Sequence, residues 1–498
     1  MKIITIFSVV SSLCFSNEFI FDYSEVDDFR NEIGIIKSQK IDDKLYLFPY
    51  IDSSQDSYFT LFEASGLKVS PVFAARFSNA SFEMFAEYTS YDLAWITPGV
   101  QFDFNRSIVF PFFDMGMSFQ AWSRFHKHSA YGFNGESVNN DLLMFPYNPH
   151  YSFEFYTKTK EPNNGIDFDE GEGAIALITP WIDIVLGKFR SKLGPFVGGN
   201  LSISNQSPGF PQFQVRLKSK KLKFILVAGE LDSELFESAT YVNENHSDLE
   251  SLFLDEELPN SALIKKIKRY VVNHRLDYNI NKNLRLGFYE QIIVGHNLSL
   301  LYLIPSMPFW SAQHSLGDTD NLQMGFDLEY LNNNSRYYGA LIVDEWAPYD
   351  TFNSNHHNWF GGQIGFSRLV SQNILFKLEY TRIEPQVYTH DHPINEPYHH
   401  GYPIGFWAKG DSEDILLNVF YSGDRNFNFT FNVRHTIMGE PKYAIENISF
   451  LESDNLKRKF SYGFNLNKRI ESSMGPFNYV LSVKNIETEN LYHNDSFI

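Results

Sequence analysis

Charged side chains of opposite sign recur in segments that have the pattern of β-strands, and their chemistry is that of ion pairs. Guanidinium and carboxylate groups form short, bidentate hydrogen bonds, so a lattice of them can brace inward-folded loops and close a pore. The alternative is that the charges are scattered over a wide lumen and solvated by water. The residues predicted to form the lattice are Arg190, Arg275, Asp277, Glu290, Asp344, Glu345, Arg382 and Asp414.

Two of these carboxylates, Asp344 and Glu345, are neighbours and match in type the acid and base of a glycosidase. Successive residues of a strand point to opposite faces, so the two cannot flank one glycosidic bond. The nucleophile motif Gly-x-Ser-x-Gly is absent, as are phosphate-loop and dinucleotide-binding patterns. We therefore expect no catalytic residues and no enzyme. A Ser–His pair assembled across a barrel, as in outer-membrane lipases, stays open.

A second group of residues has the chemistry to bind sugars or a metal ion. His390, Asp391, His392, His399 and His400 lie close in sequence, and imidazole with carboxylate suits a divalent cation. Sugar recognition suits the segment better, because aromatic rings stack on pyranose C–H faces while His and Asp satisfy hydroxyl groups. The predicted polysaccharide-binding residues are Trp310, Trp346, Trp359, Tyr388, His390, Tyr398 and Trp407.

Each of these interpretations has an alternative. The tryptophans would suit the headgroup level of a membrane equally well, since aromatic residues gather there. The histidines could belong to an exposed polar loop. We expect no metal site and no cofactor.

Alternation of apolar and polar residues defines the strands that must position these side chains. In residues 322–330, Leu, Met, Phe, Leu and Tyr alternate with Gln, Gly, Asp and Glu, and residues 374–381 and 426–434 repeat the pattern. One apolar face and one charged face suit a sheet with lipid outside and water inside. A large soluble sandwich or propeller also alternates, but no repeat of fixed period supports a propeller.

The connections alternate between short and long, which is typical of hairpins in a membrane barrel. Residues 332–335 and 422–425 read as tight polar turns, and we place them on the periplasmic side. Long connections rich in Pro, Gly, His and aromatic residues would lie outside the cell. They are residues 139–173, 295–321, 347–359 and 384–414.

The N-terminus has the features of a secretory signal. Lys2 precedes an apolar run, and small residues end at Ser16. Cleavage there would remove Cys14, the only cysteine, and exclude disulfides and thiolate metal sites. We predict a signal peptide at 1–16, an N-terminal periplasmic segment at 17–60 and an outer-membrane β-barrel at 61–498. The N-terminal segment would contain a short helix, capped by Ser24, with an apolar face formed by Val26, Phe29, Ile33 and Ile36.

Composition supports an exported barrel. Of the 498 residues, 17% are aromatic, with 48 Phe and 28 Tyr, more than a soluble core requires, and membrane barrels use such residues on the lipid face. The mean hydropathy of -0.27 fits because alternate strand residues face a polar lumen. The formal charge of -19 argues against a nucleic-acid partner.

Several motifs also resemble those of the Wzi-type capsule-assembly proteins of Gram-negative outer membranes. The segment 186–213 carries Gly, a basic pair, Gly-Pro, a glycine pair, Leu-x-x-Ser and Pro-x-Phe, and includes Gly194 and Pro195. Residues 273–278 match the family's His-Arg-Leu-Asp strand, and Glu290 matches the Glu that follows it. Residues 379–382, Glu-Tyr-Thr-Arg, belong to its final block. The matching motifs span roughly residues 120–420 in the family's order.

The resemblance implies a transmembrane antiparallel β-barrel of about eighteen strands with a small N-terminal helical element. It also implies a monomer in outer-membrane lipid that attaches or organises capsular polysaccharide or exopolysaccharide at the cell surface. The first alternative is a porin or uptake channel, which an open lumen would favour. The second is a barrel hydrolase.

Overall fold

The computed structural model describes most of the chain, and all structural statements below concern those residues. They are residues 18–20, 25–52, 62–64, 67–84, 87–109, 114–132, 154–159, 166–207, 209–237, 265–317, 320–346, 358–399, 402–423, 427–443, 449–452, 455–472 and 475–492. The predicted signal peptide and most of the first long connection lie outside them. Within them, no helix has the length and apolarity needed to cross a membrane.

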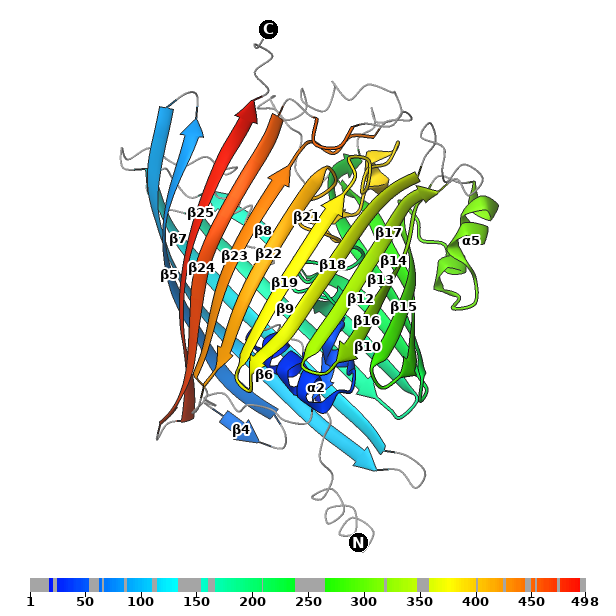
Figure 1. Cartoon of the computed structure of the whole chain (residues 1–498), viewed down its shortest axis with the longest axis horizontal. Helices are drawn as coiled ribbons and strands as arrows, with labels where there is room; N and C mark the ends of the chain where they lie inside the picture. The colour runs from blue at the N-terminus through cyan, green and yellow to red at the C-terminus, as the bar shows by residue number, and fades with distance from the viewer. Residues whose placement is uncertain are drawn as a thin grey trace, which may run out of the picture.

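The predicted all-β class is confirmed, because one large antiparallel sheet curves into a barrel (Figure 1). Its strands, in hydrogen-bonding order, are β10 (Ile182–Phe189), β12 (Phe210–Lys218), β13 (Leu222–Glu237), β14 (Lys265–Asn281), β15 (Leu284–Gly295), β16 (Asn321–Asn332), β17 (Ser335–Trp346), β18 (Asn358–Ser371), β19 (Ile374–Ile383), β22 (Ser412–Ser422), β23 (Phe427–Met438), β24 (Asn455–Ser472), β25 (Gly475–Tyr492), β4 (Phe62–Ala64), β5 (Leu67–Met84), β6 (Glu87–Val109), β7 (Asp114–Gly132), β8 (Glu154–Thr159) and β9 (Ile166–Ile178).

Short elements lie outside this sheet. The helices are α2 (Glu25–Ser38), η1 (Asp43–Leu45), η3 (Leu300–Leu303), α5 (Phe309–Leu316) and η5 (Pro393–Asn395). The two-stranded pairs are β1 (Glu18–Ile20) with β3 (Tyr50–Asp52), β2 (Leu47–Phe48) with β11 (Lys192–Leu193), and β20 (Tyr398–His399) with β21 (Tyr402–Pro403).

The alternation in the sequence separates the two faces of the wall as predicted. In β16, Phe326 and Tyr330 are 40% and 42% exposed, whereas Asp327 and Glu329 between them are buried. In β19, the same holds for exposed Leu378 between buried polar neighbours. Apolar side chains therefore cover the outside of the barrel, and polar and charged side chains line its interior.

The predicted turn at 332–335 is present as a two-residue connection between β16 and β17. Asn333 adopts the left-handed conformation there, with φ of 52°, which Asn tolerates better than most residues. The N-terminal segment lies at this end of the barrel, because the Ile41 N–H donates to the Lys282 carbonyl at the turn between β14 and β15 (2.8 Å).

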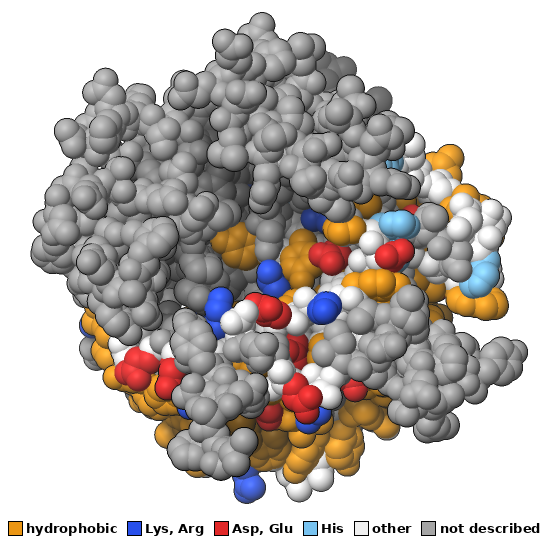
Figure 2. Space-filling view, turned by 90° about the horizontal axis from the view of Figure 1, so that it is seen from above, with side chains coloured by type: hydrophobic (Ala, Val, Ile, Leu, Met, Phe, Trp, Pro, Cys, Tyr) orange, Lys and Arg blue, Asp and Glu red, His pale blue; other side chains and the backbone are white. Residues whose placement is uncertain are grey.

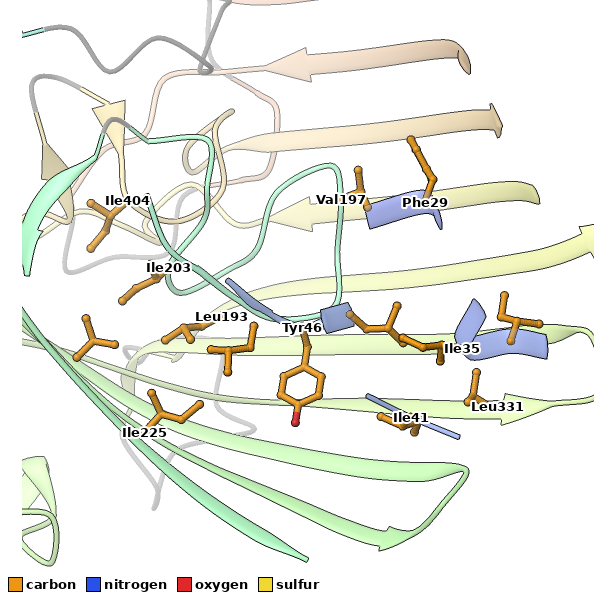
Figure 3. Close-up of a cluster of buried hydrophobic side chains, with 14 of the residues drawn as sticks. Phe29, Ile35, Ile41, Tyr46, Leu193, Val197, Ile203, Ile225, Leu331 and Ile404 are labelled. Carbon is orange, nitrogen blue, oxygen red and sulfur yellow. The ribbon is translucent and has the colours of Figure 1, made fainter. Parts of the chain in front are cut away.

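The predicted N-terminal helix is confirmed as α2, and its apolar face is buried inside the barrel wall (Figure 1). Phe29 stacks on Phe420 with ring centroids 5.1 Å apart. Near this end the inward positions of the strands are apolar and pack against the helix; they include Leu331, Leu369 and Leu375. Figure 3 shows side chains of this cluster converging from the N-terminal segment, the wall and two loops. The sequence pattern indicated the helix but gave no sign that it lies inside the barrel.

Candidate functional site

Three segments lie in the described part of the barrel interior. The N-terminal plug is residues 25–52, which include α2. The inner loop is residues 190–207, between β10 and β12, and every residue in it is buried. The rim loop is residues 384–399 and 402–411, between β19 and β22, at the end opposite the short turns. The candidate site has two parts. One is the set of charged side chains that hold these segments in place, and the other is the outer surface of the rim loop.

A buried charge network on the inner wall lies between β14 and β17. Arg275 contacts Asp277 (2.8 Å) and Asp327 (2.7 Å), and Arg285 contacts Asp277 (2.7 Å), Asp327 (2.5 Å) and Glu329 (2.6 Å). All five side chains are 2% exposed or less. Removing one member of such a network leaves an uncompensated buried charge, so the whole set must be present for it to be stable.

The network extends into the N-terminal plug through Glu32 of α2. Arg336 joins Glu329 (3.0 Å) to Glu32 (2.9 Å), and Lys377 contacts the other Glu32 oxygen at 2.6 Å. Burial alone would raise the pKa of the Glu32 carboxyl, but Lys377 and Arg336 lower this pKa from 4.5 to about 2. Glu32 is therefore a carboxylate at neutral pH and pins α2 to two strands.

Further contacts hold the N-terminal plug along its length. Lys192 of the inner loop contacts Asp28 at 2.6 Å, and both are buried. The Arg285 guanidinium lies 3.8 Å from the ring centroid of Tyr46, and Arg216 donates to the Pro49 carbonyl at 2.8 Å. The plug is thus bound to the inner loop near its start and to the wall near its end.

The inner loop is held through its backbone. Glu379 accepts hydrogen bonds from the Val197 and Gly198 N–H groups (3.1 and 2.7 Å), and Arg336 donates to the Pro195 carbonyl at 3.1 Å. Gly194 has φ of +141°, a conformation that favours glycine. The predicted motif residues Gly194 and Pro195 therefore shape a loop that wall charges fasten.

The predicted lattice residues fall into two groups. Arg275 and Asp277 meet in the network. Asp414 pairs with Arg434 (2.8 Å), Arg190 lies 3.9 Å from Glu172, and Asp344 accepts hydrogen bonds from Gln323 and the Tyr388 N–H. These three are buried but separate from the network.

Glu290 and Arg382 do not belong to the lattice, contrary to the prediction, because both face outward. Glu290 alternates with buried Gln291 on the same face as exposed Phe288, and it accepts from the Phe309 N–H of α5 at 2.9 Å. Arg382 is exposed and lies 3.9 Å from the Phe450 ring. The side chain of Glu345 lies outside the described residues.

The prediction of sugar binding is also wrong for two aromatic residues. Trp359 and Tyr388 are 1% and 0% exposed and belong to a core cluster beneath the rim loop, so neither ring is accessible for stacking. Trp310 is 57% exposed but lies on α5, outside the wall. The Trp346 side chain lies outside the described residues.

The remaining three predicted residues, His390, Tyr398 and Trp407, all belong to the rim loop and are partly exposed. Cationic side chains lie beside the rings of Tyr398 and Trp407. Arg434 and Lys459 lie 4.5 and 4.9 Å from the Trp407 ring centroid, and the Lys409 amino group lies 5.0 Å from that of Tyr398. Figure 2, seen from this end, shows acidic and basic side chains grouped over the middle of the barrel. This surface can stack on sugar rings and bond hydroxyl groups.

The histidines of the rim loop do not gather around a common point. His390 and His392 have ring centroids 5.6 Å apart. Burial and the neighbouring His392 lower the pKa of His390, so its imidazole is neutral at neutral pH. Among the described residues, no three His, Cys, Asp or Glu side chains are placed to hold a metal ion.

Most of the network was missed by sequence reasoning, namely Glu32, Arg285, Asp327, Glu329, Arg336 and Lys377. Alternation carried a signal for part of it, because it placed Glu329 and Lys377 on the polar face. The same alternation would have put Arg382 on the outer face, together with Leu378 and Tyr380.

No family model matches the chain, and no curated protein matches it either. Among solved structures, it is similar to Wzi of Escherichia coli, described as an outer membrane protein involved in group 1 capsule assembly and a carbohydrate binding β-barrel. The TM-score is 0.54 at 11% identity, over 95% of this chain and 96% of that one. This likeness shows the fold, an outer-membrane type of β-barrel.

Two further barrels match at lower scores. They are OccAB4 of Acinetobacter baumannii (TM-score 0.43, 10% identity, 85% and 94% covered) and the outer membrane protein OprD of Pseudomonas aeruginosa (0.41, 10%, 85% and 88%). Both likenesses are too distant to bear on function.

Proposed function

We propose that this protein is a closed outer-membrane barrel of about eighteen strands that attaches or organises capsular polysaccharide or exopolysaccharide at the cell surface. It acts by non-covalent binding and has no catalytic residue. The polymer contacts the rim loop, and the barrel anchors it to the membrane.

The observation that carries the proposal is that three segments fold into the barrel interior. Three separate segments occupy the barrel, and buried ion pairs such as Glu32 with Arg336 and Lys377 fasten them to the wall. A channel needs a continuous path for its solute, whereas an anchor needs a rigid platform beneath its binding surface. The carbohydrate binding reported for the structurally similar Wzi agrees with this proposal.

The rim loop is suited to be the binding surface. Its backbone is braced from below, since Arg269 donates to the Ile394 and Glu396 carbonyls (3.3 and 3.0 Å) and Tyr388 donates to the Leu201 carbonyl at 2.6 Å. Rigid support lowers the entropy cost of binding. Tyr398 and Trp407 then present ring surface to the polymer, with cations beside them.

The test is to delete the gene and measure the polysaccharide that stays on the cells and the polysaccharide in the medium. We expect a loss from cells that equals the gain in the medium. Restoring the gene with Tyr398→Ala and Trp407→Ala together should leave retention low. Trp181→Ala is the matched control, since Trp181 is exposed at the opposite end of the barrel, and it should restore retention fully. Unchanged retention after deletion would refute the anchor function.

A further inference from the structure

The connection between β15 and β16 turns away from the barrel and packs against the outside of the wall. Figure 1 shows α5 beside β15, projecting beyond the sheet at the rim-loop end. Tyr302 and Phe309 of this segment are fully buried against outward side chains of the wall such as Val272 and Ile292. A connection that only joined two strands would not need this packed layer.

The segment covers a polar feature of the outer wall. His274 and Glu290 face outward on neighbouring strands and contact each other at 3.2 Å. The Phe309 ring lies 4.2 Å from that of His274, and the Phe309 N–H donates to Glu290 at 2.9 Å. Polar groups facing hydrocarbon are costly, so α5 shields this pair and uses Glu290 as its own N-terminal acceptor.

The free side of the segment carries no formal charge and exposes several large apolar side chains among small polar ones. Residues 296–317 include no Lys, Arg, Asp or Glu. Leu300 is 77% exposed, Ile304 41%, Trp310 57% and Leu316 43%. Large exposed apolar side chains are unfavourable in water. They suit the boundary between headgroups and acyl chains, where an amphipathic helix lies with Trp and Leu buried.

The exposed surface of α5 also continues the apolar belt of the barrel. Leu276, Phe288 and Phe326, on the three strands next to it, are 38%, 50% and 40% exposed on the same outer face. In Figure 2, hydrophobic side chains lie at the outer edge on the side where α5 projects in Figure 1. The surface that lipid would cover on the strands therefore adjoins α5, with the partly buried Glu290, hydrogen-bonded to Phe309, between Phe288 and the segment.

We propose that residues 297–317 form an interfacial anchor that lies in the outer lipid leaflet and fixes the depth and tilt of the barrel on one side. Its partner is lipid, with Trp310 at headgroup level and Leu300, Ile304 and Leu316 directed to acyl chains. The inference rests on the proposed location of the barrel in a membrane, but it is independent of polysaccharide binding.

The test uses spin labels at single cysteines in a Cys14→Ser background, with the full chain reconstituted in phosphatidylcholine vesicles. Labels are placed by Trp310→Cys on α5, by Phe288→Cys on the outer wall and by Lys282→Cys at the short-turn end. For each label, accessibility to oxygen, which concentrates in lipid, is compared with accessibility to a nickel chelate, which stays in water. All three positions are exposed, so the substitutions leave the core intact.

We expect the label at 288 to have high oxygen and low nickel accessibility, and the label at 282 to have the reverse. The label at 310, at headgroup level, should lie between them, with nickel accessibility well below that at 282. Nickel accessibility at 310 equal to that at 282 would overturn the anchor. Broadening of the 310 spectrum that disappears on dilution with unlabelled protein would also overturn it, because the surface would then meet a second copy. A water-exposed label at 288 would instead refute the membrane location, which keeps the two failures distinct.

Discussion

Glu32 joins the N-terminal plug to the charged wall, and its carboxylate makes the stability of the protein depend on pH. The pKa of Glu32 is lower in the folded chain than in the unfolded chain. The contribution of Glu32 to the free energy of unfolding is therefore fully present above the pKa that Glu32 has in the unfolded chain. This contribution is lost as the pH falls towards about 2. The size of the shift corresponds to about 3 kcal/mol.

Glu32→Gln should lower the free energy of unfolding at neutral pH by about 3 kcal/mol. The difference from wild type should stay constant down to about pH 5 and shrink at lower pH. Urea titrations in detergent at a series of pH values measure this. Asp27→Asn is the matched control, because the Asp27 side chain is 42% exposed and its pair with Arg30 (3.4 Å) is partly solvated, so the pair is worth little. A difference that does not change with pH would contradict the role of the Glu32 charge.

Gly287 leaves room for two of the network's arginines, Arg275 and Arg285, to lie close together. A Cβ atom there would lie 2.3 Å from Arg275 Nη2 and 2.7 Å from Arg285 Nη1. Gly287→Ala should therefore destabilise the protein by about 1–3 kcal/mol through displaced side chains. Gly362→Ala is the control, because no atom lies within 4 Å of its Cβ position. Equal unfolding midpoints for the two variants would show that the network tolerates the methyl group.

At the scale of elements, α2 is held by its ion pairs and by its apolar face. Phe29→Ala removes the stack on Phe420 and leaves a cavity in the plug, at a cost of about 3–5 kcal/mol. We expect faster amide hydrogen exchange across α2 and unchanged exchange in β16–β19. Lys37→Ala, at an exposed position of the same helix, should leave the exchange as in wild type. Faster exchange throughout the wall would mean that α2 and the barrel unfold as one unit.

Alternation of residue types predicted the strands, their two faces and the short turns, because each depends on neighbours along the chain. It also indicated α2 through the spacing of Phe29, Ile33 and Ile36. The position of α2 inside the barrel depends on contacts with strands that lie hundreds of residues away in the sequence, so no local pattern reveals it. Burial of Trp359 and Tyr388 was missed for the same reason, since aromatic residues in a loop can pack inward or face the solvent.

At the scale of the whole molecule, the three segments inside the barrel predict that the intact protein does not conduct ions. In planar bilayers we expect the current to equal that of a protein-free membrane. The reason is that the N-terminal plug, the inner loop and the rim loop occupy the described interior together. An outer-membrane porin serves as the positive control for insertion. Stepwise, steady currents from the wild-type chain would favour the uptake-channel alternative over the anchor.

The same plug sets the order in which the barrel can be assembled. Glu32 bonds to Arg336, 304 residues later in the chain, and α2 packs on strands that follow still later. Contacts between such distant residues form slowly, because a long loop must close before they add stability. The helix must therefore wait, with its apolar face unpaired, until those strands are in place, and it must enter before the wall closes around it. A factor that holds the first fifty residues during export would shorten this vulnerable interval, and its loss would be felt as aggregation of newly made chains.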